Sequence, residues 1–265
     1  MTRGVLTGKW ALILGASSGF GAATARELSR CGMHIIGVHL DRKTTLPNAE
    51  ALIKEIQAQG AQAHFFNVNA ADPLKRQEVL DQIQPTLGGS PIAVLMHSLA
   101  FGTLKPYLAQ DPKEQLTKDQ MEMTLDVMAN SLVYWVQDLL ARKLIGNGSR
   151  VFAMTSSGGR RVWHTYGAVS AAKAALESHV RQLAMELAPR GITVNAIRAG
   201  VTATPAAQKI PGYDRLEADA RARNPSGRMT TPDDVGRAIA VLAHADTHWI
   251  TGNVIGVDGG EDIVG

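Results

Sequence analysis

The sequence predicts an α/β protein in which one doubly wound domain, residues 1–265, holds a mostly parallel seven-stranded sheet with helices on both faces. Short apolar runs alternate with longer amphipathic stretches, the pattern of parallel strands joined by crossover helices. No repeat, low-complexity tract or linker divides the chain. Seven apolar runs have the length and bounds of buried strands: residues 10–14, 34–38, 63–68, 92–97, 150–155, 192–197 and 254–257.

Residues 15–21 join the first predicted strand to a helix over residues 22–30, and their glycines are spaced Gly-x3-Gly-x-Gly. Such a junction directs backbone N–H groups and the positive end of a helix at one point, where a pyrophosphate can bind. Glycine allows the ligand to approach bare backbone. Taken alone, the motif is equally compatible with an ordinary tight turn.

The next helices follow from their flanking residues. A polar turn over 41–43 leads from the second strand to a helix over 49–59, which ends at Gly60. Pro73 begins another helix, which ends near Pro85. Residues 119–143 are predicted to form one long helix whose apolar stripe packs in the core; the stripe includes Met121, Leu125, Met128, Leu132 and Trp135.

In a doubly wound sheet the ligand site lies beyond the carboxyl ends of the strands. The segments that follow the predicted strands should therefore converge; they are residues 15–21, 39–43, 67–68, 97–102, 155–159 and 199–206. A polar stretch over 205–227, with Pro205, Pro211 and Pro225, is too long for a minimal connection. We expect this stretch to be a loop that acts as a lid over the site.

Composition excludes several classes of protein. Hydrophobic residues make up 45% and charged residues 19% of the chain, and the net charge is only +3. Basic residues alternate with acidic ones, as over 215–221, so a solvated helix face is expected and no nucleic-acid partner. No apolar run approaches the ~18 residues of a membrane span, and the N-terminal residues lack the basic, apolar and small-residue succession that is typical of a signal peptide. A single cysteine, Cys31, excludes a disulfide within the chain, and the expected location is the cytoplasm.

Two histidines, His244 and His248, stand four residues apart as metal ligands on a helix can. The sequence provides no third ligand near them, so a polar helix end is the better interpretation and no metal is predicted.

Tyr166 and Lys173 carry the chemistry that we expect at the site. They are seven residues apart, close to two helical turns, so both emerge on one face if the helix begins near Tyr166. A nearby ammonium stabilises a phenolate and lowers the pKa of the phenol, which makes the tyrosine a proton donor. The alternative is a surface lysine and a packed tyrosine.

These residues belong to a wider set of motifs. The chain resembles a short-chain dehydrogenase/reductase over essentially its whole length, which implies a single NAD(P)-binding Rossmann domain. The resemblance rests on four motifs in the expected order: the glycine turn, Asn195-Ala196-Ile197-Arg198-Ala199-Gly200 with Thr204 following, Ile250-Thr251-Gly252, and Val257-Asp258-Gly259-Gly260.

Three departures from the ordinary members point to one branch of that family. Ordinary members carry Tyr-x3-Lys, and Val169 stands here at the position of their tyrosine. The Tyr-x6-Lys spacing of this chain resembles that of the enoyl-acyl carrier protein reductases. His97-Ser98-Leu99-Ala100-Phe101 resembles their loop after the fourth strand, where ordinary members have Asn-Asn-Ala-Gly. Ala199-Gly200 likewise resembles their Ala-Gly form in place of Pro-Gly.

The displaced tyrosine has a chemical reason. Hydride delivered to an enoyl thioester reaches the β-carbon, and charge accumulates on the oxygen of a carbonyl group two bonds away, so the proton or oxyanion donor must move correspondingly. The resemblance implies that Tyr166 stabilises the enolate and that Lys173 holds the nicotinamide ribose and supports the phenol. Ser156 stands 17 residues before the lysine, where ordinary members keep a catalytic serine. Met128 occupies the helix position where ordinary ketoreductases carry the asparagine of their proton relay. A thioether cannot hold that water chain, so this departure counts against carbonyl chemistry.

The resemblance also assigns the cofactor site. NAD-specific members carry an acid at the position of His39, whereas Asp41 here lies two residues later beside Arg42 and Lys43. The two cations favour the 2′-phosphate of NADPH over NADH. The implied cofactor residues are Gly15, Ser17, Ser18, Gly19, Phe20, Gly21, His39, Leu40, Arg42, Asn67, Val68, Ser98, Leu99, Ala100, Lys173, Thr202 and Thr204, and the implied substrate residues are Phe101, Gly102 and Tyr166.

The leading hypothesis is an NAD(P)H-dependent reductase of the 2,3 double bond of an enoyl thioester, carried on acyl carrier protein or coenzyme A. Phe101, Tyr107 and Trp163 would cover the acyl chain, and His164 lies near the same helix. The alternative is a ketoreductase or alcohol dehydrogenase with an unusual tyrosine position. A cofactor-binding sensor without activity is a third class, disfavoured by the intact Tyr166–Lys173 pair. Family members are usually homotetramers, which leads us to expect one here, with 249–264 between subunits.

Overall fold

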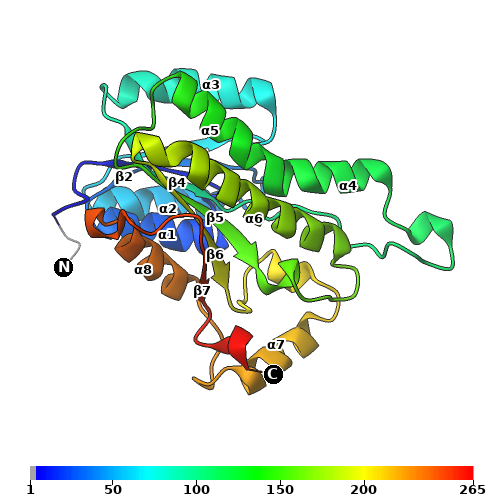
Figure 1. Ribbon diagram of the computed structural model, residues 1–265. Coiled ribbons are helices and arrows are strands. Elements are labelled where there is room, and N and C mark those ends of the chain that lie inside the picture. The colour runs from blue at the N-terminus through cyan, green and yellow to red at the C-terminus, as the bar shows by residue number, and fades with distance from the viewer. Residues whose placement is uncertain (1–3, 265) are drawn as a thin grey trace.

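A seven-stranded sheet forms the centre of the computed structural model, which describes residues 4–264 (Figure 1). The strand order is β3-β2-β1-β4-β5-β6-β7 and every neighbouring pair is parallel. The order reverses between β1 and β4, where a doubly wound sheet opens its ligand crevice. The predicted fold is confirmed. The strands are β1 (Trp10–Leu14), β2 (His34–His39), β3 (Ala63–Asn67), β4 (Ile92–His97), β5 (Arg150–Ser156), β6 (Thr193–Ala199) and β7 (Val254–Val257).

Helices cover both faces of the sheet (Figure 1). One hydrophobic cluster joins the sheet to α3 (Pro73–Thr86), α5 (Ser131–Ala141) and α6 (Gly167–Leu187). A second cluster joins the opposite face to α1 (Gly19–Arg30), α2 (Leu46–Ala58) and α8 (Pro232–Leu242). Because both faces are covered, the central strands are apolar on both sides, as their continuous hydrophobic runs predict.

The prediction of one regular helix over 119–143 is wrong in its middle. The chain forms α4 (Lys118–Leu125), then a π-helical turn over Asp126–Asn130, and then α5. The hydroxyl of Ser131 donates to the carbonyl of Val127 at 2.8 Å, within the widened part of the helix. Such turns are frequent at functional sites, and this one carries the buried Met128.

The prediction of a loop over 205–227 is also wrong. The segment contains a short 3-10 turn (Ala207–Lys209) and helix α7 (Tyr213–Arg223). Its prolines flank α7 and do not interrupt it, and ion pairs at i,i+4 spacing, Glu217 with Arg221 and Arg215 with Asp219, support the helix. Figure 1 places α7 beside the C-terminal segment, away from the main helix layers.

Two kinds of feature are absent from residues 4–264. Within that range, the structure has no helix that combines the length and the apolar character of a membrane span. The same range contains no group of three or more His, Cys, Asp or Glu side chains placed to hold a metal ion.

Candidate active site

The glycine turn forms a cradle at the amino end of α1, which begins at Gly19, earlier than the predicted residue 22. Gly15 and Gly19 have φ values of +88° and +52°, a region that favours glycine. The side chain of Ser18 makes no capping hydrogen bond, and no acidic residue lies in the first turn of α1. The amino end of the helix is therefore available to an anion, and this turn fits the pyrophosphate of a nicotinamide dinucleotide.

The segments after the strands converge on this turn, as predicted. A Cβ at Gly15 would lie 2.4 Å from the carbonyl oxygen of Ser98, after β4. A Cβ at Gly19 would lie 3.4 Å from the methyl group of Thr204, after β6. The loops after β4 and β6 thus pack directly against the turn that would hold the cofactor.

The loop after β2 is held by several hydrogen bonds. His39 Nδ1 lies 2.7 Å from Asp41 Oδ2. Burial, the largest influence, raises the pKa of Asp41, but hydrogen bonds to Ser17, Thr45 and His39 together lower it below its ordinary value. Asn67 accepts from the amide of Asp41 at 2.8 Å and donates to its carbonyl at 3.1 Å. The Asn67 amide is therefore committed to this loop.

Tyr166 caps α6, which confirms the prediction that the helix begins near this residue. The hydroxyl of Ser156 hydrogen-bonds to the phenol, which lowers its pKa, but burial is the larger influence and leaves the pKa of Tyr166 raised. The expected lowering by Lys173 is thus wrong in direction, because desolvation of the phenolate outweighs the stabilising contact. At neutral pH Tyr166 is a neutral phenol that can donate a hydrogen bond.

Lys173 is held two turns further along the same helix. Its side chain is buried, and Nζ donates to the carbonyl of Met154 at 2.7 Å. Burial lowers the pKa of Lys173 to about 8, against the opposing influence of Glu177. Lys173 is therefore largely a cation at neutral pH.

The position one turn before Lys173, where Tyr-x3-Lys would place the tyrosine, is filled by an apolar side chain. Val169 is 5% exposed and packs with Met128 and Ala172. Gly102 closes the same cluster, since a Cβ there would lie 2.8 Å from Thr124, 2.9 Å from Met128 and 2.9 Å from Val169. The atoms that meet at Gly102 are apolar carbons and the Met128 sulfur, so the position of the ordinary tyrosine is closed by apolar packing.

A mainly apolar cavity of about 470 Å³ lies between the loop before Tyr166 and the segment that leads into α7. Trp163 lines it and donates from its indole N–H to the carbonyl of Pro211 at 3.2 Å, which joins the catalytic loop to the segment before α7. Phe101 and Tyr107 are exposed, and Tyr107 packs on Gly167 at the start of α6. The cavity is lined by Val162, Trp163, His164, Pro211, Gly212 and Arg215.

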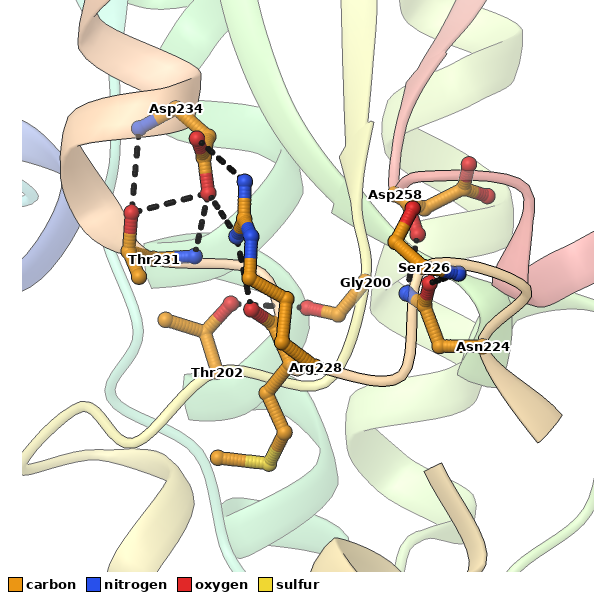
Figure 2. A network of polar contacts seen from close by, with 9 residues as sticks. Gly200, Thr202, Asn224, Ser226, Arg228, Thr231, Asp234 and Asp258 are labelled. Carbon is orange, nitrogen blue, oxygen red and sulfur yellow. Dashed lines mark hydrogen bonds and ion pairs between the residues drawn. The ribbon is translucent and has the colours of Figure 1, made fainter. Parts of the chain in front are cut away.

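Polar contacts fix the segment that returns from α7 (Figure 2). Arg228 donates to Asp234 at 2.7 Å and 3.0 Å, and Thr231 and Asp234 form a capping box at the start of α8. Asn224 donates to the carbonyl of Asp258 at 2.8 Å, after β7. Both ends of α7 are thus attached to neighbouring parts of the site.

The C-terminal turn (Glu261–Ile263) reinforces this arrangement. Asp262 pairs with Arg160 at 2.8 Å, Arg161 at 3.2 Å and Arg198 at 3.2 Å. Glu261 accepts from the amide of Val201 at 3.0 Å and lies 3.7 Å from Arg223 at the end of α7. One turn therefore connects the loop before Tyr166, the end of β6 and α7.

The other residues implied for the cofactor lie on the same edge of the sheet. The backbone amide of Ser98 donates to the carbonyl of Leu14 at 2.8 Å, and the backbone amide of Val68 donates to the carbonyl of His39 at 2.8 Å. Phe20 and Leu99 pack partly buried against the two cores. Exposed side chains are Ser18, Leu40, Arg42 and Ala100, and buried ones are Thr202 and Thr204.

Comparison with known proteins gives this arrangement its family. Residues 15–261 match the family described as enoyl-(acyl carrier protein) reductase, a branch of the short-chain dehydrogenases. The chain belongs to the short-chain dehydrogenase/reductase family. Because the match covers nearly the whole chain, NAD(P)H-dependent oxidoreductase chemistry follows for this member of the family.

Individual relatives of this short-chain reductase divide between two chemistries. The enoyl-[acyl-carrier-protein] reductase [NADH] FabI of Aquifex aeolicus is 29% identical, with 99% of this chain and 94% of that protein covered. A crystal structure of an enoyl reductase (NADH) from Aquifex aeolicus VF5 has a TM-score of 0.85, 25% identity and 99% coverage of both chains. The 3-oxoacyl-[acyl-carrier-protein] reductase FabG of Thermotoga maritima is 26% identical, with 96% of this chain and 98% of that protein covered. A crystal structure of a Burkholderia cenocepacia short chain dehydrogenase in complex with NADP has a TM-score of 0.82 and 27% identity, with 97% of this chain and 99% of that chain covered.

Sequence reasoning missed several polar groups that surround the site of this reductase. Thr155 and Glu177 hydrogen-bond inside the protein at 2.7 Å, and His97 Nε2 lies 2.8 Å from the hydroxyl of Ser131. Burial, with a smaller influence from Lys173, lowers the pKa of His97 to about 3, so its ring is neutral. A carboxylate one turn after the lysine is a signal that could have identified Glu177, whereas His97 and Ser131 are 34 residues apart on separate elements and have no local signal.

Proposed function

We propose that this short-chain reductase reduces the 2,3 double bond of an enoyl thioester with NAD(P)H. The observation that carries the proposal is a pair of positions at the start of α6: Tyr166 supplies a phenol at the N-cap, and Val169 fills the ketoreductase position with a buried apolar side chain. A donor at Tyr166 is displaced by one turn from the ketoreductase donor. This displacement suits charge that develops on a thioester carbonyl oxygen, remote from the carbon that accepts hydride, and not on an oxygen bonded to that carbon.

The residues of the chain would then divide the work as follows. NAD(P)H, when bound along the glycine turn, supplies the hydride. Tyr166 donates a hydrogen bond to the thioester oxygen and stabilises the enolate, and Ser156 polarises its hydroxyl. Lys173 supplies a fixed cation at the nicotinamide ribose, held by the Met154 carbonyl. Apolar side chains around the cavity at Trp163 exclude water from the acyl chain.

NADPH is our preferred cofactor over NADH. Arg42 and Lys43 are exposed beside the adenosine side of the turn. The Asp41 carboxylate is engaged by Ser17, Thr45 and His39. A 2′-phosphate would meet two cations, while the carboxylate that would accept from ribose hydroxyls is already hydrogen-bonded.

An acyl carrier protein or coenzyme A would carry the substrate, and α7 would act as the lid. Attachment of both ends of α7 to the site supports that role. We also propose a homotetramer, for which the exposed apolar side chains of Val241, Trp249 and Ile250 offer a surface. Light scattering of the wild-type protein and of a Trp249→Glu variant tests the assembly; an unchanged mass would remove Trp249 from it.

A spectrophotometric panel tests the reaction. Crotonyl-coenzyme A, crotonyl-acyl carrier protein and a set of simple ketones are each mixed with NADPH and with NADH, and oxidation of the cofactor is followed. We expect turnover of the crotonyl thioesters and preference for NADPH. Turnover of ketones but not of enoyl thioesters contradicts the proposal.

A carbonyl reductase is the second candidate function, and Ser156 is the observation that favours it. Ser156 occupies the place of the ordinary catalytic serine and reaches the phenol of Tyr166, so the pair could donate to a substrate carbonyl. The ketone arm of the same panel decides between the two chemistries.

A further inference from the structure

Lys173 and Glu177, two charged residues of α6, are hydrogen-bonded to successive residues of strand β5. Lys173 donates to the carbonyl of Met154 at 2.7 Å. The next residue of β5, Thr155, donates its hydroxyl to Glu177 at 2.7 Å. Lys173 and Glu177 are four residues apart, so they lie on the same face of α6. The end of β5 thus fixes a cation and a carboxylate side by side.

This pair is enclosed. Lys173, Thr155 and Glu177 are 5%, 5% and 9% exposed. The turn after β5 covers them: a Cβ at Gly159 would lie 3.5 Å from Cβ of Lys173 and 3.6 Å from Oε1 of Glu177. An ammonium in such a place has little water to stabilise its charge, and a neighbouring carboxylate replaces part of that stabilisation.

We propose that Glu177, oriented by Thr155, is a positioning residue that keeps Lys173 protonated and directed toward the cofactor site. The inference rests on the proposed role of Lys173 at the nicotinamide ribose. Glu177 touches neither cofactor nor substrate and acts through the lysine alone. Its negative charge raises the pKa of Lys173 against the lowering by burial.

The other titratable groups around Lys173 leave this role to Glu177. His97, at the end of β4, remains neutral because its pKa is about 3. Tyr166, at the start of α6, remains neutral because its pKa is raised. Asp126 lies on the π-helical turn, which packs against α6; burial raises its pKa although Arg76 opposes the shift, and Lys173 is not among the charges that act on it. The contacts from β5 and from Gly159 carry no charge.

The experiment measures pH profiles in Glu177→Gln, which keeps the shape of the side chain and removes its charge. NADPH affinity, followed by fluorescence, and kcat with crotonyl-coenzyme A are measured from pH 6 to 10. In the wild-type protein both should decline as the pH rises through about 8. In Glu177→Gln the inflection should move down by about one pH unit. Glu186→Gln, which changes an exposed carboxylate of the same helix, should keep the wild-type profile.

Thr155 provides the second variant if Glu177→Gln folds poorly. Thr155→Val should move the inflection in the same direction, and Thr155→Ser, which keeps the hydroxyl, should restore it. Loss of activity with an unmoved inflection in Glu177→Gln and Thr155→Val would overturn the inference, because a structural role lowers the whole profile evenly. The fluorescence readout needs no enoyl substrate, so failure of the proposed reaction is visible separately.

Discussion

Ser156 and Tyr166 are hydrogen-bonded although one ends strand β5 and the other caps helix α6. The same serine oxygen accepts from the amide of Gly158 at 3.1 Å, and Ser170 donates its hydroxyl to the Gly158 carbonyl. These contacts fix the phenol relative to the strand and the helix together. A donor held in this way needs little reorganisation when charge develops on the substrate.

Tyr166→Phe removes the hydroxyl and keeps the ring. We expect kcat with crotonyl-coenzyme A to fall by about 10²- to 10³-fold, because one preorganised donor is lost, while NADPH affinity changes little. Steady-state kinetics and fluorescence titration measure the two quantities. Tyr134→Phe, on α5, is the matched control and should keep wild-type kcat. Equal turnover in both variants would exclude Tyr166 from the chemistry.

Ser156→Ala leaves Tyr166 in place without its partner. Since the Ser156 hydrogen bond lowers the pKa of the phenol, its loss should make Tyr166 a weaker donor. We predict a fall in kcat of roughly 10-fold, smaller than that of Tyr166→Phe, with KM nearly unchanged. A double variant, Ser156→Ala with Tyr166→Phe, should be no slower than Tyr166→Phe alone. Additive losses would show that Ser156 contacts substrate independently.

Asp41 and Arg42 should affect cofactor choice in opposite directions. Asp41→Asn removes a negative charge beside Ser17 of the glycine turn, so kcat/KM for NADPH should rise relative to NADH by about 10-fold. Arg42→Ala should lower the same ratio by a similar factor. The ratio of kcat/KM for the two cofactors is the measurement. A shift of the same sign in both variants contradicts the assignment of this loop to the 2′-phosphate.

His97 should make stability sensitive to mild acid. Its folded pKa of about 3 lies below the ordinary 6.5, so between these values only the unfolded chain binds the proton, and stability falls as the pH falls. From pH 7 to 5 the loss should be about 2 kcal/mol of unfolding free energy. The pKa of the Asp234 carboxyl is lowered from 3.8, so its protonation reduces stability only below the range of pH 5 to 7.

Urea unfolding at pH 7, 6 and 5 checks this expectation. His97→Asn should show a smaller fall in unfolding free energy than the wild-type protein across that range. His248→Asn, which changes an exposed histidine, should follow the wild-type curve. Parallel curves for His97→Asn and wild type would show that His97 is not buried in its neutral form.

Strand positions followed from apolar runs alone, because burial on both faces of a parallel sheet leaves a continuous hydrophobic signal. Helix α7 was missed because Pro205, Pro211 and Pro225 suggested an irregular loop, whereas Pro211 and Pro225 stand just outside Tyr213–Arg223. The π-helical turn was missed because its one-residue widening leaves the apolar stripe almost unchanged. Local sequence indicates where a helix is favoured, but tertiary contacts decide its interruptions.

At the site, spacing predicted which residues meet but not their protonation. The segments after the strands converge as the topology requires. The direction of the Tyr166 pKa shift was wrong, because the sequence shows a nearby lysine but not how deeply the phenol is buried. Glu177 was overlooked for the related reason that its partner, Thr155, lies 22 residues earlier on another element.

The tight contacts of the glycine turn have a consequence for how this scaffold can diversify. A Cβ at Gly21 would lie 1.9 Å from the carbonyl oxygen of Gly15, and one at Gly15 would lie 2.4 Å from that of Ser98. No side chain can be accommodated there without displacing backbone. Adaptation to new substrates must therefore proceed through the surroundings of the cavity, such as Trp163 and the segment that leads into α7, while the dinucleotide end stays constant.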